Sequence, residues 1–227
     1  MTRLFALFFF VALMGLASLN LARAQISAPK TYLESLKWLE HAAREGDKLA
    51  QYRLGQVLDK GLKGTVDKNE AVIWYVKAAR QGYIPSQMRL AQMYYDGDGI
   101  ELDLANSFGW YHMAAEEGVA QAQFNCGVML EAGAGIEKNL LKAAKYHQSA
   151  AMKGFADAQV NLAMLYARGG GVELDVNRAM TWLEVAILGG KSVPRNVYDS
   201  LSSALSPNQR DEIKISAQRL YAETIGK

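Results

Sequence analysis

Apolar and polar positions repeat along this chain with a period of 36 residues. Each period contains two stretches in which apolar residues follow the i, i+3, i+4 spacing of an amphipathic helix. The chain therefore predicts a series of helical hairpins, each built from a helix A, a turn, a helix B and a short exit. Glycines close successive periods without any slippage in spacing: Gly46, Gly82, Gly118, Gly154 and Gly190.

Counting positions from the residue after each closing glycine explains the local chemistry of the repeat. Position 21 is Asp or Asn just before helix B, where its side chain can cap the first turn. The closing glycine suits the left-handed position that follows a helix. Small residues at positions 4, 9 and 32 allow the helices to approach closely, and position 28 is always aromatic. The four full units are 47–82, 83–118, 119–154 and 155–190.

A single hairpin of this size cannot bury its apolar face, whereas several stacked hairpins share a continuous core. The fold class predicted is therefore all-α, a solenoid of stacked hairpins. Residues 32–46 match a lone helix B and are expected to cap the N-terminal end. Residues 191–227 diverge from the repeat and are expected to form capping helices, the last one beginning at a Ser206–Gln209 capping box.

The pattern A-x-A-Q-x-x-L-G, G-x-G-V, D, A, W-Y and A-A-x-x-G resembles the Sel-1-like repeat, a relative of the tetratricopeptide repeat. The resemblance covers residues 32–190 and implies a right-handed α-solenoid that presents a concave surface to partners. The first unit departs from it, with Lys63-Gly64 where later units have Gly-Ile or Gly-Val, so its turn is expected to be reshaped. In the third unit the resemblance is carried by Ala122, Gln123, Gly127, Gly133, Gly135, Ala143, Ala150, Ala151 and Gly154.

Residues 1–24 have the layout of a secretory signal peptide. Arg3 precedes an apolar run, and Ala22-Arg23-Ala24 offers small residues for cleavage before Gln25. We therefore expect an exported protein, periplasmic or secreted, with a mobile leader at 25–31 and no stable membrane insertion after cleavage. The alternative is an uncleaved anchor, because the apolar run is just long enough to cross a bilayer core of ~30 Å.

Charge disfavours two classes of partner. Removal of Arg3 and Arg23 with the signal lowers the 25 basic residues to 23, equal to the 23 acidic ones. Basic residues are not clustered anywhere in the chain, and binding to nucleic acid or to an anionic membrane depends on such clusters. We therefore expect no nucleic-acid partner.

Cys126 is the only cysteine, so no disulfide can form within the chain. It occupies position 8, which is Leu in the other units, and we predict a buried, unpaired thiol there. The alternative is a reactive thiol or a bridge between molecules. Some exported members of the family are cysteine-rich and have been linked to β-lactam binding. The cysteine pair of those members is missing here, which weakens the transfer of that activity.

Candidate catalytic and metal-binding residues are scarce. His41, His112 and His147 occur at different repeat positions and form no ligand pair. Asp96-Gly97-Asp98-Gly99 lacks the spacing of a calcium loop and coincides with a turn. The sequence contains no nucleophile elbow or phosphate-binding loop. We therefore predict no catalytic residues, no metal site and no cofactor.

The candidate binding surface lies on helix A. In tetratricopeptide relatives, the residue two before the small helix-A residue projects into the groove, and here that is position 7. The hypothesis is a ladder for an extended peptide, in which Arg binds a carboxylate and Asn binds peptide amides. The alternative is that position 7 is solvated or bonds between repeats. Candidate residues are Arg53, Arg89, Asn125 and Asn161 at position 7, Gln56 and Gln92 at position 10, and Tyr95 at position 13.

Two further expectations accompany the ladder. Arg53 and Arg89 should both be exposed to solvent, so that they can face a ligand together. The glutamine at position 5 recurs in all four units and is expected to have a structural role. These glutamines are Gln51, Gln87, Gln123 and Gln159.

The sequence thus favours an exported, non-enzymatic scaffold that binds a protein or peptide segment in its concave face. One alternative is a binder or hydrolase of small molecules or cell-wall fragments, related to the cysteine-rich members of the family. Another is a structural subunit of an envelope assembly that uses the edges of the solenoid.

Overall fold

The computed structural model describes residues 32–225. The expected signal peptide, residues 1–24, and the leader, residues 25–31, lie outside the described residues. Within 32–225 all regular structure is α-helical, and the chain forms a right-handed α-solenoid as the repeat predicts.

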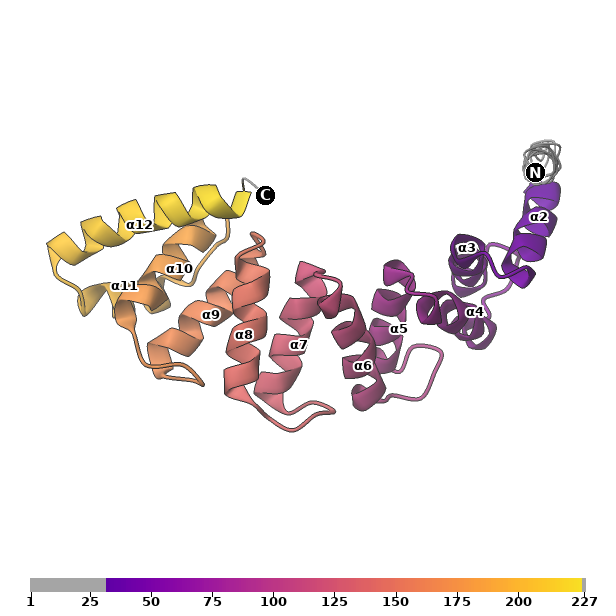
Figure 1. Cartoon of the computed structure of the whole chain (residues 1–227), viewed down its shortest axis with the longest axis horizontal. Helices are drawn as coiled ribbons and strands as arrows, with labels where there is room; N and C mark the ends of the chain where they lie inside the picture. The colour runs from indigo at the N-terminus through magenta and orange to yellow at the C-terminus, as the bar shows by residue number, and fades with distance from the viewer. Residues whose placement is uncertain (1–31, 226–227) are drawn as a thin grey trace, which may run out of the picture.

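The four units form four helical hairpins. Their A helices are α3 (Lys48–Asp59), α5 (Ile84–Asp96), α7 (Ala120–Ala132) and α9 (Ala156–Arg168). Their B helices are α4 (Lys68–Arg80), α6 (Leu104–Glu116), α8 (Leu140–Ala151) and α10 (Val176–Leu188). Each helix packs chiefly on its neighbours in sequence, so the hairpins form an arc in which the loops after α5, α7 and α9 follow the convex rim (Figure 1).

Additional helices cover the two ends of the arc. Helix α2 (Tyr32–Arg44) packs on α3 at the N-terminal end. The short α11 (Arg195–Ser203) leads to α12 (Pro207–Ile225), which lies along α10 (Figure 1). Ile213 and Ala217 of α12 are buried, as the apolar face of this segment predicts.

The caps predicted for the B helices and for the last helix are all present. Asp67, Asp103, Asn139 and Asp175 each accept a hydrogen bond from a backbone N–H in the first turn of their helix B. The Ser206–Gln209 capping box is complete, with bonds of 2.9 and 3.3 Å.

Asp67 and Glu70 have the spacing of a capping box, but only half of the box is formed. The Asp67 side chain accepts from the Glu70 N–H at 2.9 Å. The Glu70 carboxylate does not return to the cap, because it accepts a hydrogen bond from the Trp74 indole at 3.3 Å. The aromatic residue at position 28 therefore competes with the cap for this carboxylate.

The turns after helix A differ between the first unit and the others. Helices α5, α7 and α9 end on left-handed glycines with φ between 68° and 74°. Helix α3 instead ends at Lys60, which is right-handed with φ −94°, and the chain reverses over Gly61 and Gly64. The expectation of a reshaped first turn is confirmed.

The second glycine of the G-x-G turn packs on the preceding unit. A Cβ on Gly135 would lie 2.2 Å from the backbone of Leu104, at the start of α6. A Cβ on Gly171 would lie 2.2 Å from the backbone of Leu140, at the start of α8. Only glycine allows this approach, so the turn also sets the spacing between units.

The recurring glutamine at position 5 is structural, as predicted. Each of the four donates its side-chain amide to a backbone carbonyl near the end of the preceding helix B, at 3.1–3.2 Å. All four are nearly or fully buried. The same carbonyl also accepts the backbone N–H of the closing glycine, so the glutamine adds a second bond that fastens one hairpin to the next.

Cys126 is fully buried and unpaired, which confirms the prediction for position 8. It lies in the cluster that joins α5, α6 and α7, together with Ala91, Tyr111 and Met129. Burial, with a smaller contribution from Glu116, raises the pKa of the thiol to about 12.

Candidate functional site

The position-7 residues lie at the boundary between units, and the structure separates them into two kinds. Arg53 on α3 is exposed, as expected. Its guanidinium makes one long hydrogen bond, 3.4 Å to the Gln56 side chain. This side chain can therefore reach a ligand with little rearrangement.

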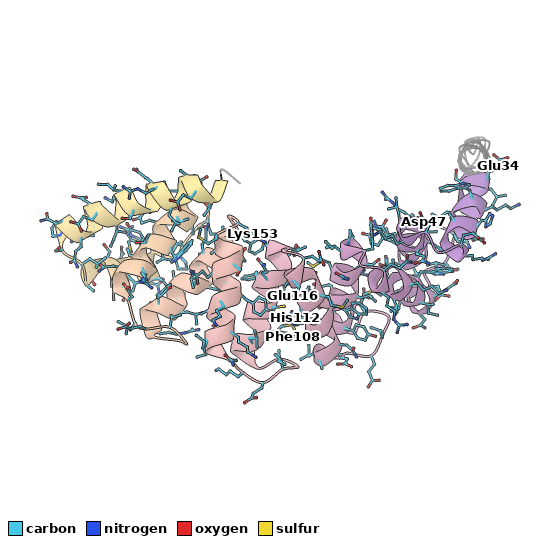
Figure 2. All side chains as sticks on the ribbon, viewed as in Figure 1. Glu34, Asp47, Phe108, His112, Glu116 and Lys153 are labelled. Carbon is cyan, nitrogen blue, oxygen red and sulfur yellow. The ribbon has the colours of Figure 1, made fainter. Side chains whose placement is uncertain are left out.

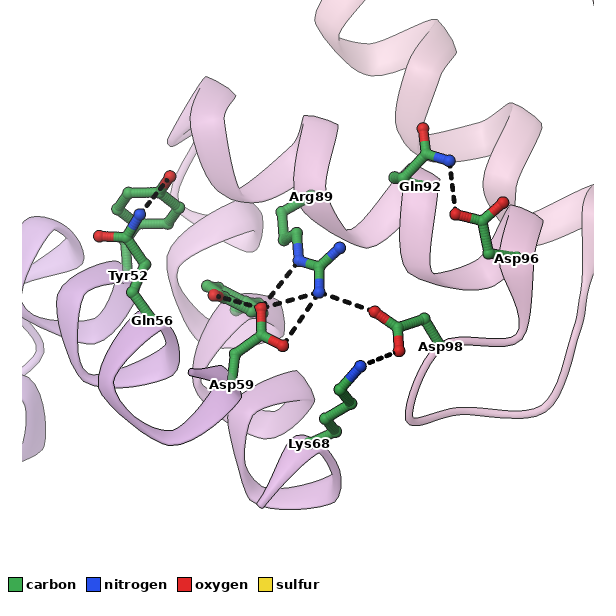
Figure 3. Close-up of polar contacts among 9 residues, drawn as sticks. Tyr52, Gln56, Asp59, Lys68, Arg89, Gln92, Asp96 and Asp98 are labelled. Carbon is green, nitrogen blue, oxygen red and sulfur yellow. Dashed lines mark hydrogen bonds and ion pairs between the residues drawn. The ribbon is translucent and has the colours of Figure 1, made fainter. Parts of the chain in front are cut away.

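Arg89 is held inside an ion network, and the expectation that it would be solvent-exposed is wrong. Its side chain is only 29% exposed. Nε and Nη2 donate to Asp59 at 2.9 and 3.0 Å, and Nη2 also donates to Asp98 at 2.8 Å (Figure 3). Asp59 belongs to the preceding unit, so this arginine links two units.

Further groups complete the Arg89 network (Figure 3). Lys68 pairs with Asp98. Its hydrogen bond, and then that of Arg89, outweighs partial burial and lowers the pKa of Asp98. The Tyr75 hydroxyl donates to Asp59 at 3.2 Å, and burial together with this carboxylate raises the pKa of Tyr75.

The two asparagines at position 7 also differ. Asn125 faces the hydroxyl of Tyr111 in the preceding unit, which itself donates to Gln92 at 3.0 Å. Asn161 is half-buried and has no side-chain hydrogen bond among the described residues. Position 7 thus bonds between repeats at Arg89, and it remains open at Arg53 and Asn161.

Positions 10 and 13 extend the same row along helix A. Gln56 donates to the Tyr52 hydroxyl at 3.0 Å. Gln92 donates to Asp96 at 2.6 Å and accepts from Tyr111 at 3.0 Å. The ring of Tyr95 is 42% exposed, which gives α5 an aromatic contact surface.

A cleft of about 420 Å³ opens between α7 and α9 at the C-terminal end of this row. Asn161 lies in its wall beside Val128 of position 10. Glu131 and Arg168 form an ion pair in the same wall. The cleft therefore joins an unpartnered amide, an apolar side chain and a charged pair.

Glu131 also binds a buried histidine that sequence reasoning did not place in the site. The Nε2 atom of His147 lies 2.7 Å from the Glu131 carboxylate, and the imidazole is fully buried. Burial alone would raise the pKa of Glu131, but the hydrogen bonds from His147 and Arg168 outweigh it and lower that pKa. The available signal was that both acids at position 13, Asp59 and Glu131, occur in units with a polar ring at position 29, Tyr75 and His147.

The described residues contain no group of three or more His, Cys, Asp or Glu side chains placed to hold a metal ion. No described helix is both long enough and apolar enough to cross a bilayer.

A comparison with known protein families recovers the same repeat. Five consecutive segments match the family model described as Sel1 repeat, over residues 13–47, 48–83, 84–119, 120–155 and 156–191. The search of curated proteins gave no match. The resemblance inferred from the sequence is thereby confirmed.

A solved structure from the same family shows the same architecture. A Sel1 repeat protein from Oxalobacter formigenes is 27% identical with a TM-score of 0.67, and the alignment covers 93% of this chain and 84% of that one. A protective antigen of uropathogenic Escherichia coli with an SLR fold is 27% identical with a TM-score of 0.49, over 86% of this chain and 50% of that one.

Proposed function

We propose that this chain, which belongs to the Sel1 repeat family, binds a segment of another protein along its layer of A helices. The solenoids of this family are typical of protein–protein interaction scaffolds and are generally non-catalytic. The observation that carries the proposal is the cleft between α7 and α9, because Val128 lines it together with Asn161, whose amide has no partner among residues 32–225. An amide and an apolar side chain together suit the backbone and one side chain of an extended peptide.

The row leading to this cleft supplies further contacts. Tyr95 offers an exposed ring, and aromatic side chains are favoured anchors in protein interfaces. Arg53 offers a guanidinium without an ion pair among the described residues, suited to a carboxylate of the partner. Arg89 serves instead to hold the first two units in register, so it is not a partner contact in this proposal.

Export is the second part of the proposal. The charge, apolar run and Ala22-Arg23-Ala24 site within residues 1–24 support a role outside the cytoplasm, periplasmic or secreted. N-terminal sequencing of the protein recovered from the envelope or medium should begin at Gln25. A recovered form that begins at Met1 would instead mean that the segment is not cleaved and holds the protein at the membrane as an anchor.

The binding proposal is tested by affinity capture from envelope extracts, quantified by mass spectrometry. The double variant Tyr95→Ala/Asn161→Ala should lose the partner that the wild type captures, with helical circular dichroism unchanged. The matched control is Glu101→Ala/Glu137→Ala, two exposed residues on the loops between A and B helices, which should capture as the wild type does. Undiminished capture by the first variant would move the binding surface away from the A helices.

A further inference from the structure

A second cleft, of about 490 Å³, opens in the layer of B helices between α6 and α8. Its volume falls within the range of roughly 300–1,000 Å³ that ligand sites occupy. Phe108, His112 and Glu116 line one wall and follow one another along α6 at the middle of the arc (Figure 2). Ile136, which is 38% exposed, adds apolar surface, and the buried Leu130 lies beneath the cleft.

The third unit has smaller residues at two positions of the cleft where other units have larger ones. Position 28 is Trp in the other three units and the smaller Tyr146 here. Position 12 is Tyr94 and Tyr166 in the second and fourth units but Leu58 and Leu130 in the first and third. Only the third unit combines the smaller residue at both positions.

Three rings give the cleft an aromatic wall. The Phe108 and His112 rings are 5.9 Å apart between centroids, and His112 and Tyr146 meet edge to face at 6.3 Å. The Tyr146 hydroxyl and His112 Nδ1 are 3.1 Å apart, which fixes the orientation of both rings. The wall suits a flat or branched apolar side chain.

Two lysines at the cleft have no charged partner within the described part of the chain. Lys142 and Lys145 line it from α8, and neither ammonium has an ion pair or hydrogen bond among the described residues. The equivalent of Lys142 in the fourth unit is Arg178, which lies over the Tyr166 ring and pairs with Asp175. The third unit lacks that ring, and its cation is free to meet a ligand.

From this combination we infer that the α6–α8 cleft binds a protein segment in which a large apolar side chain stands next to carboxylates. The apolar side chain packs against Phe108, Tyr146 and Ile136. The carboxylates pair with Lys142 and Lys145, since opposite charges beside an apolar contact give both affinity and orientation. The Glu116 carboxylate can accept a backbone N–H of the segment.

This site lies in the other helix layer from the proposed helix-A surface and does not depend on it. A scaffold with both sites could hold two segments at once. Variants of one surface leave the residues of the other untouched, so the two proposals fail or succeed separately.

The probe for the test is a fluorescein-labelled peptide, Ser-Asp-Phe-Glu-Gly-Ser, titrated with the purified protein by fluorescence anisotropy. The variant Lys142→Glu/Lys145→Glu should weaken binding by about tenfold or more. The control Lys37→Glu/Lys48→Glu makes the same change in net charge at two exposed lysines outside the cleft and should bind as the wild type does. Peptides with Ala for Phe, or with Asn and Gln for Asp and Glu, should bind more weakly.

A second variant keeps the test independent of charge reversal. Tyr146→Trp restores the residue of the other units, and it should fill the cleft and weaken binding while the melting temperature is retained. The helix-A variant Tyr95→Ala/Asn161→Ala should bind the peptide normally. The inference is overturned if the wild type does not bind the peptide, if both cleft variants bind it as tightly as the wild type, or if only the helix-A variant loses it.

Discussion

Asp59 and Arg89 show how a single side chain can link two units of a solenoid. Arg89 reaches back to a carboxylate whose side chain is only 9% exposed, and the Tyr75 hydroxyl bonds to the same carboxylate. Asn125 faces the Tyr111 hydroxyl of the preceding unit. Position 7 therefore lies where a side chain can reach the preceding unit, and Arg89 uses it to bond to Asp59.

Arg89→Ala should destabilise the protein by roughly 1–3 kcal/mol, because it leaves the nearly buried Asp59 carboxylate without its ionic partner. The neighbouring variant Arg53→Ala removes an exposed side chain and should stay within about 0.5 kcal/mol. Urea titration of both variants measures the difference. Equal stability of the two would mean that the Asp59–Arg89 pair contributes nothing to the fold.

Glu131 should make stability depend on acid pH. Its pKa is lowered below the ordinary 4.5 in the folded protein, so its stabilising contribution is complete above the unfolded pKa. That contribution is lost as the pH falls through the folded pKa. Glu131→Gln should therefore be less stable than the wild type at neutral pH, and the gap should narrow on acidification below about 4.5. Unfolding free energies measured from pH 7 to pH 3 provide the test, and a constant gap would contradict it.

Cys126 should react slowly with a thiol reagent in the native protein. The thiol is fully buried and its pKa is raised to about 12, so little thiolate is present and access is blocked. Labelling should become fast in denaturant. Rapid labelling of the native protein, or a disulfide-linked dimer on a non-reducing gel, would contradict burial at this position.

At the scale of a helix, glycine at position 9 makes room for a ring from the facing helix B. A Cβ on Gly55 would lie 2.7 Å from the Tyr75 ring, and one on Gly127 would lie 2.6 Å from the His147 ring. The same two units carry an acid at position 13 that bonds to the ring, Asp59 in the first. Glycine, ring and acid thus form one packing arrangement, absent from the units that have alanine at position 9.

Gly127→Ala should destabilise the protein by roughly 1–3 kcal/mol, because the new methyl group overlaps a buried ring. Gly109→Ala is the matched control, since nothing lies within 4 Å of an added Cβ there. It makes the same substitution inside helix α6 and should stabilise the protein by about 0.5–1 kcal/mol. Thermal melts should shift in opposite directions, and a stabilising Gly127→Ala would refute the packing argument.

Much of the fold could be predicted from the sequence because its determinants are local. Caps such as Asp103, closing glycines such as Gly118 and helical periodicity each act within a few residues of chain. The half-formed capping box at Asp67 was harder to predict, since the Trp74 indole competes for Glu70. Rules based on neighbouring residues do not decide whether the Glu70 carboxylate will accept from the cap N–H or from the Trp74 indole.

The candidate site was less predictable because its contacts cross units. The exposure of Arg89 depends on Asp59, which lies thirty positions earlier and faces it only after the hairpins stack. Helix periodicity placed both residues on helix A but not against each other. The buried His147–Glu131 bond was missed for the same reason, as its partners come from two helices.

At the scale of the whole molecule, the helix-A row changes character along the arc. In the first two units Arg89, Asp59, Asp98 and Lys68 pair with one another, and Arg53 lies outside this network. In the last two units a cleft opens and Asn161 is unpartnered among the described residues. We therefore expect rigidity in the N-terminal half of the row and most of the partner contact in the C-terminal half.

Site-specific photocrosslinking in cells tests the central claim most directly. A benzoylphenylalanine at Tyr95 replaces one exposed aromatic ring by another on the helix-A layer. A second protein with the same group at Ile215, which is 59% exposed on the capping helix α12, is the control. We expect a crosslinked protein partner from the Tyr95 position and none from Ile215. Adducts from Ile215 with none from Tyr95 would contradict binding along the A helices.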